Sequence, residues 1–166
     1  MVSTIQIINN LNHRIMTLAE ALSLRKDLQA RIEQLKQRLL NNIKVQEGEE
    51  PTEDPKDLMG EMNGCLEQLE TLIFRINATN MLTTHDGKTI TQLNAERDVL
   101  KMRVEFLRHL TNSASQLNNR YSRTEIKTVA TIEVKPLRKQ IDKLSETLRK
   151  LDLRIQTLNF TTELAS

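Results

Sequence analysis

Apolar residues recur along this sequence at alternating intervals of three and four positions, and this pattern constrains the fold more than any other feature. It is clearest in two stretches, which read Leu58, Met62, Cys65, Leu69, Leu72, Ile76 and Leu137, Ile141, Leu144, Leu148, Leu151, Ile155, Leu158. An average interval of about 3.5 residues places every member on one narrow stripe of an α-helix. The pattern therefore predicts helices that pack against other helices, of the same chain or of a partner.

The composition favours an all-α protein. Aromatic residues make up 2% of the chain, tryptophan is absent, and only four glycines and three prolines are available to interrupt helices. A core without aromatic bulk must be filled by Leu and Ile side chains between helices. We therefore expect an all-α fold, an antiparallel bundle of long helices organised as coiled-coil hairpins.

Breaks in the apolar pattern divide the chain into four helices. Residues 47–57 (EGEEPTEDPKD) contain one glycine and two prolines, which a continuous helix does not tolerate. Asp54 followed by Pro55 is a favourable helix start, and Thr89 with Gln92 matches a capping box. We expect helices over about residues 16–46, 56–81, 90–116 and 136–159.

Residues 120–135 (RYSRTEIKTVATIEVK) differ from the rest of the chain because β-branched and polar residues alternate there. Such alternation predicts a short extended strap or strand. A lone strand needs a pairing partner. We expect that partner to be either the turn at Asp86-Gly87 or the same segment of another subunit.

The third predicted helix carries two apolar stripes instead of one. The first stripe reads Leu93, Arg97, Leu100, Val104, Leu107, and the second reads Val99, Met102, Phe106, Leu110. Two apolar faces imply contacts on two sides of the helix. A monomer would leave the second stripe exposed, so we expect a homo-oligomer, either a dimer or a multiple of one.

Three polar residues, Arg25, Asn42 and Arg97, occupy positions where the stripes should be apolar. Polar residues in such a seam fix register and partner choice at a cost in stability. The alternative is a seam that is locally open to water. For Arg97 the expected mate is an acid on a facing helix.

The sequence contains no motif that predicts catalysis, so we expect a protein that is not an enzyme and holds no cofactor. Glu105 and His109 are four residues apart and could supply two metal ligands, but two ligands do not make a site. Cys65 falls on a helix seam, where a small buried hydrophobe is the expected role. A net charge of only +2 argues against nucleic acid as a partner.

The location expected for the protein is the cytoplasm. No run of about 18 apolar residues could span a membrane, and the first residues lack the basic region of a signal peptide. Residues 1–15 join no clean heptad and are expected to be an extension, either a mobile arm or the product of a misassigned start. Residues 16–164 are expected to form a single domain.

Several phrases of the sequence are familiar when they are taken together and in order. They are Met16–Leu22 (MTLAEAL), Asn41–Pro55 (NNIKVQEGEEPTEDP), Arg75–Asn80 (RINATN), Asp86–Leu100 (DGKTITQLNAERDVL), Tyr121–Val129 (YSRTEIKTV) and Leu151–Leu164 (LDLRIQTLNFTTEL). This set resembles the small bacterial septicolysin-like family over nearly all of Met16–Leu164. The chain departs from the family in residues 1–15 and in Phe160, which stands where the family has Trp.

The resemblance implies helical proteins that assemble into rings or hexamer-like oligomers, and the family name implies a pore-forming, haemolysin-like activity. The leading hypothesis is a non-enzymatic, self-assembling helical protein. The first alternative is a pore-forming cytolysin, the one case in which the protein would contact a membrane. However, each charge at the membrane centre costs about 2.5–3.5 kcal/mol, and the weakly charged stretches are short. The second alternative is a bundle that binds a small ligand or a metal.

Overall fold

The computed structural model describes residues 16–115 and 129–165, and within them it confirms an all-α protein. The described elements in chain order are α2 (Leu18–Asn42), α3 (Pro55–Leu82), β1 (Thr84–His85), β2 (Lys88–Thr89), α4 (Ile90–Ser115) and α5 (Val134–Thr161). They fall into two compact units, divided after Thr84 and after Thr157. The first unit holds α2, α3 and the C-terminal segment, and the second holds the β-hairpin, α4 and most of α5.

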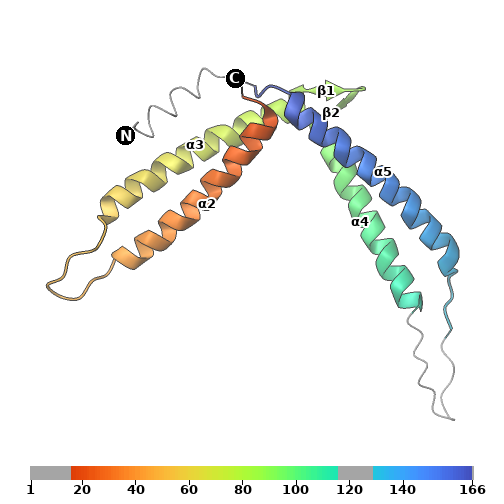
Figure 1. Cartoon of the computed structure of the whole chain (residues 1–166), viewed down its shortest axis with the longest axis horizontal. Coiled ribbons are helices and arrows are strands. Elements are labelled where there is room, and N and C mark those ends of the chain that lie inside the picture. The colour runs from red at the N-terminus through yellow and green to blue at the C-terminus, as the bar shows by residue number, and fades with distance from the viewer. Residues whose placement is uncertain (1–15, 116–128, 166) are drawn as a thin grey trace, which may run out of the picture. The chain divides into compact units, whose positions relative to one another are not determined.

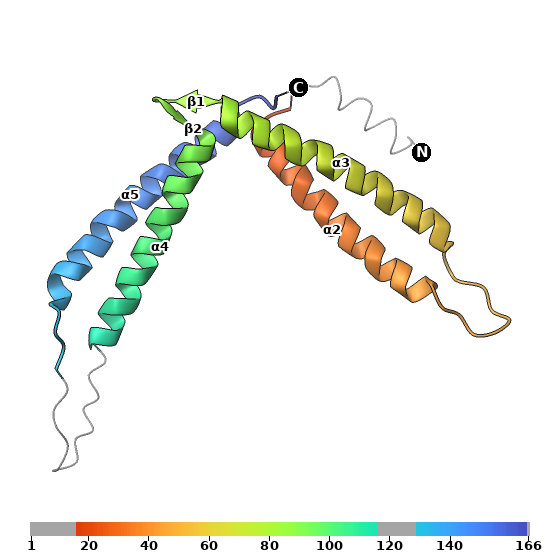
Figure 2. The same cartoon turned by 180° about the vertical axis from the view of Figure 1, so that it is seen from behind.

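The first unit is built on an antiparallel hairpin of α2 and α3 (Figures 1 and 2). The start of α2 is set by Thr17, whose hydroxyl accepts a hydrogen bond from the Glu20 amide while the Glu20 carboxylate accepts one from the Thr17 amide. Apolar side chains at helical spacing are buried on both helices. They are Leu18, Ala21, Leu28, Leu35, Leu58, Leu72 and Ile76.

The first helix begins two residues later than predicted, at Leu18, and ends four residues earlier, at Asn42 instead of Gln46. The amide of Ile43 closes the last turn on the Leu39 carbonyl at 3.0 Å. Gly48 then takes a left-handed backbone conformation, with φ +90, which turns the connector back toward α3. The other three predicted helices differ from the observed ones by no more than two residues at either end.

The C-terminal segment closes the first unit. Leu164 is buried, its amide donates to the Met16 carbonyl at 2.8 Å, and the Thr162 carbonyl accepts from the Leu18 amide at 2.8 Å. Ala165 is held on α3, because its carbonyl accepts from Arg75 Nε and its amide donates to Thr79 Oγ1. Residues from the two ends of the described chain therefore cover the same core.

Two glycines lie inside α3 at positions where no close contact within the chain requires the absence of a side chain. A Cβ added at Gly60 or Gly64 would meet nothing within 4 Å. Glycine inside a helix costs about 0.5–1 kcal/mol relative to alanine. We expect Gly60→Ala to raise the free energy of unfolding by about that amount, measured by urea denaturation followed by circular dichroism. Gly48→Ala is the matched control and should lower stability, because its positive φ disfavours a side chain.

The second unit begins with a tight hairpin between β1 and β2. Asp86 and Gly87 both have positive φ, 50 and 76, as the predicted Asp-Gly turn requires. The hairpin strands pair with each other. Arg154 of α5 binds the turn, with Nη2 2.7 Å from Asp86 Oδ2 and 3.1 Å from the His85 carbonyl oxygen. The predicted Thr89 and Gln92 capping box then starts α4.

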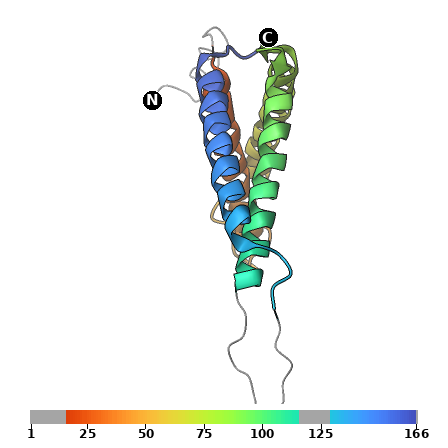
Figure 3. The ribbon, with the colours of Figure 1, turned by 90° about the vertical axis from the view of Figure 1, so that its right-hand side faces the viewer.

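The two helices of the second unit, α4 and α5, run side by side in opposite directions (Figures 1 and 3). Val104 and Leu107 of α4 form a buried cluster with Ile141 of α5, and Leu137 and Leu144 pack against it. Helix α5 starts at Val134, two residues before its predicted start, because proline at Pro136 is tolerated in the first turn of a helix.

The predicted strap over residues 120–135 is not confirmed as a strand in its described part. Residues 129–133 have no regular structure, and the last two residues of the strap belong to α5. Most of the strap, residues 116–128, lies outside the described residues, as does the predicted extension over residues 1–15. In the described part of the chain, the short strands on either side of the Asp86-Gly87 turn form a two-stranded sheet with each other.

Candidate functional site

The second apolar stripe of α4 is exposed. The side chains of Val99, Met102 and Phe106 are 59%, 67% and 63% accessible, while Leu110 at the end of the stripe is half-buried. The other stripe of the same helix, with Val104 and Leu107, faces α5. The two stripes differ by about half a turn around the helix axis, so the outer stripe faces away from α5.

A second apolar face remains uncovered on α3. Met59, Leu66 and Ile73 follow one another at intervals of seven residues, and all three are exposed. The helical spacing of Leu66 and Ile73 would allow them to widen the packed stripe of this helix. Instead they lie beside it, because a single partner helix, α2, covers only one narrow stripe of α3.

The charged groups beside the outer stripe of α4 are nearly all paired within the chain. Arg97 donates two hydrogen bonds to Asp98 Oδ1, at 3.0 and 2.8 Å, and Lys88 Nζ lies 2.5 Å from Glu96 Oε2. Lys101 and Glu105 form a looser pair at 4.0 Å. Among the described residues Arg103 makes no ion pair, although it is exposed and adjacent to Met102.

The polar seam residues have different surroundings. Arg25 is half-buried on α2. Arg97 has about a third of its side chain exposed and binds Asp98, its neighbour on the same helix, where the sequence predicted an acid on a facing helix. The reason is geometric: Asp98 is within reach of the guanidinium without any contact between helices.

Asn42 is the polar seam residue that the structure ties to a definite contact. It is buried, its Nδ2 donates to the Arg38 carbonyl at 2.9 Å, and its Oδ1 accepts from the Glu53 amide at 3.1 Å. Arg38 in turn binds the Glu53 carboxylate with two nitrogens. These three residues fix the connector between α2 and α3 to the end of α2.

The pairing with Arg38 holds the pKa of the Glu53 carboxyl below its ordinary value of 4.5. A lowered folded-state pKa means that this stabilisation is present above the unfolded-state pKa and is lost as pH falls through the folded-state pKa. We therefore expect Glu53→Gln to be less stable than the natural chain at neutral pH. This difference should shrink below about pH 4.5, as measured by urea midpoints across pH 3–7. A difference independent of pH would contradict the linkage.

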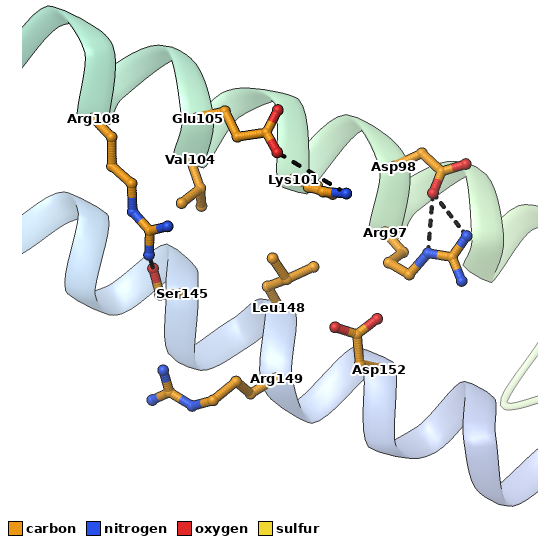
Figure 4. A pocket seen from close by; sticks show the side chains of 10 residues that line it. All are labelled: Arg97, Asp98, Lys101, Val104, Glu105, Arg108, Ser145, Leu148, Arg149 and Asp152. Carbon is orange, nitrogen blue, oxygen red and sulfur yellow. Dashed lines mark hydrogen bonds and ion pairs between the residues drawn. The ribbon is translucent and has the colours of Figure 1, made fainter.

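A groove of about 500 Å³ lies between α4 and α5 (Figure 4). Its lining residues are Arg97, Asp98, Lys101, Val104, Glu105, Arg108, Ser145, Leu148, Arg149 and Asp152. Four cations and three acids line it. Arg108 reaches Ser145 Oγ at 3.3 Å, and Arg97 and Lys101 pair with Asp98 and Glu105 as described above. The groove therefore does not concentrate one sign of charge for a ligand.

The two metal-ligand candidates are not brought into a larger cluster. No group of three or more His, Cys, Asp and Glu side chains that could hold a metal occurs in residues 16–115 and 129–165. Glu105 lies 4.0 Å from Lys101.

Cys65 is half-buried on α3, and burial raises the pKa of its thiol, which keeps it in the less reactive protonated form. Of the helices described, none has the length and apolar character that crossing a membrane would require.

The comparison with protein families corrects the family predicted from the sequence. Residues 25–164 match the model of DUF6847, described as a family of unknown function. The septicolysin-like assignment is therefore wrong, because it rested on short phrases, whereas the family model spans most of the chain. The expected hexamer-like rings and pore-forming activity rested on that assignment and lose their support with it.

The comparison with solved structures finds one similar throughout its length. It is the crystal structure of a functionally unknown conserved protein from Corynebacterium diphtheriae, 38% identical, with a TM-score of 0.84. The match covers 92% of this chain and 100% of the other chain. None of the curated proteins compared matches the chain.

Proposed function

Because the chain belongs to DUF6847, a family of unknown function, we propose a function from its own surfaces: it is a non-enzymatic helical protein that assembles with copies of itself. The observation that carries the proposal is the exposed outer stripe of α4. Its three side chains Val99, Met102 and Phe106 are large, apolar and mostly accessible, and they follow one another along one line of the helix.

Exposing such an apolar stripe to water is unfavourable in free energy. Burying apolar area contributes about 25 cal/mol per Å², so covering these side chains would stabilise an assembly. Contiguous exposed apolar patches on proteins commonly mark interaction sites. Scattered exposed residues need no such explanation, but a line at intervals of three and four residues has the geometry of a helix-packing seam.

A second copy of the chain is the partner that this surface fits best. A seam that is one stripe wide can pack against one further helix, and α4 of a second copy supplies a helix with a matching seam. Closed two-fold pairing is the commonest arrangement among homo-oligomers. The assembly is accordingly a dimer or a multiple of one.

Multi-angle light scattering at micromolar concentration tests the proposal. We expect the natural chain to have the mass of a dimer or a multiple of it, and Met102→Lys to shift the mass to that of a monomer. Leu153→Lys is the matched control, since Leu153 is 66% exposed on α5 and lies off the stripe; it should leave the mass unchanged. A monomeric natural chain would contradict the proposal.

A further inference from the structure

We infer that the outer stripe of α4 pairs with the same stripe of a second copy in parallel orientation and in register. This inference rests on the proposed function and specifies the interface that it needs. Val99, Met102 and Phe106 of one copy then lie against the same residues of the other. The two orientations of the pair are distinguished by the charges that flank the stripe.

Three residues of the outer stripe, Val99, Met102 and Phe106, belong to a regular seam of five positions, which Leu110 flanks. Its members are Ala95, Val99, Met102, Phe106 and His109, at intervals of four, three, four and three residues. In heptad notation Val99 and Phe106 occupy position a, and the other three occupy position d. The flanking positions are then fixed: Asp98 and Glu105 fall at g, and Glu96, Arg103 and Leu110 fall at e.

In a parallel pair each g residue faces the e residue five positions further along the other helix. Asp98 of each copy therefore faces Arg103 of the other, which gives two attractive ion pairs. Glu105 faces Leu110 of the other copy, so no like charges meet. The parallel orientation has charge complementarity without repulsion.

In an antiparallel pair with the same seam, g residues face g residues and e residues face e residues. Asp98 then faces Glu105 of the other copy, which places two pairs of like charges across the interface. Glu96 would face Arg103, so two attractive pairs would be offset by the two repulsive ones. The flanking charges therefore favour the parallel orientation.

Asp98 and Arg103 each have a group that is available for the parallel pairing. Both hydrogen bonds from Arg97 end on Asp98 Oδ1, which leaves Oδ2 for a second guanidinium (Figure 4). Arg103 is the flanking cation that makes no ion pair with any described residue of its own chain. Arg97 is thus a positioning residue, which holds the Asp98 carboxylate beside the seam.

Charge reversal tests the orientation. Asp98→Lys and Arg103→Glu each replace two attractive pairs with two repulsive ones, so each variant alone should have a dimer dissociation constant at least about tenfold weaker than that of the natural chain. Mixed in equal amounts, the two variants should form a heterodimer, because each interface pair is then attractive again. Sedimentation velocity with one variant fluorescently labelled measures all three cases.

The Asp98→Lys variant gives the opposite result for the antiparallel orientation. There Asp98→Lys would face Glu105 of the other copy and tighten self-association, which would overturn the inference. Assembly unchanged by either variant would also overturn it while leaving the proposed function intact. A natural chain that is monomeric would overturn both.

A cross-link provides a measurement that does not depend on the charge variants. Ala95→Cys in a Cys65→Ser background should form a disulfide between two copies under mild oxidation, because parallel pairing in register places the two positions opposite each other. Ser113→Cys, one turn beyond His109 on the same seam, should do the same. Failure of both to cross-link in an oligomeric sample would contradict the parallel register.

Discussion

A chain that ends at Thr161 should lose about 4 kcal/mol or more of the free energy of unfolding of its first unit. The truncation removes the buried side chain of Leu164, and with it the cover over the ends of α2 and α3. Removing a buried leucine side chain costs about 2–5 kcal/mol. It also removes four hydrogen bonds to that unit, from Thr162, Leu164 and Ala165, each with a net value of about 1 kcal/mol.

Urea denaturation followed by circular dichroism measures the effect, and two point variants separate its parts. Leu164→Ala should reproduce a large share of the loss, since it removes the side chain and leaves the backbone bonds. Glu163→Ala is the control, because Glu163 is exposed and lies between the same bonded residues; its effect should stay within about 0.5 kcal/mol. A truncated chain as stable as the full one would show that the segment is not part of the core.

The C-terminal segment also shows what the sequence pattern could not predict. The apolar repeat predicted four helices and their boundaries closely, because a long periodic run of Leu and Ile has few other structures available to it. Leu164 carries no such signal, since a single apolar residue beyond the last helix has no period. The segment that carries it is held by hydrogen bonds to Met16 and to α3, which are distant in sequence.

The candidate face of α4 could be located from the same apolar periodicity, while its role as an oligomer interface stays a prediction. The two stripes of α4 were visible in the sequence, and the structure buries one and exposes the other. The exposed face of α3 could not be distinguished from a packed one, because the sequence does not state how many helices will cover a given stripe. The sequence also could not predict the partners of the polar seam residues, since a charged side chain can form an ion pair along its own helix as readily as with a neighbouring helix.

Asn42 bonds to the connector after α2, whereas Arg97 pairs along its own helix. Replacing Asn42 with leucine should therefore lower stability, and replacing Arg97 with leucine should keep or raise it. Asn42→Leu removes the acceptor of the part-buried Glu53 amide and the donor to the Arg38 carbonyl, and each of these hydrogen bonds has a net value of about 0.5–1.5 kcal/mol. Arg97→Leu removes a partly exposed pair between neighbours on one helix, and such pairs contribute about 0–1 kcal/mol. The apolar replacement adds contact with the seam of α5, so stability should be kept or raised.

Urea denaturation of the two variants at pH 7 tests this contrast. Asn42→Asp is the control for the first, because a carboxylate oxygen can still accept from the Glu53 amide, although it places a negative charge near the Glu53 carboxylate. It should recover part of the loss caused by Asn42→Leu. If Asn42→Leu instead left stability unchanged, the connector would not depend on this side chain. A loss of 3 kcal/mol or more for Arg97→Leu would mean that Arg97 pairs across the helices with a buried acid, by analogy with broken buried ion pairs at about 3–5 kcal/mol.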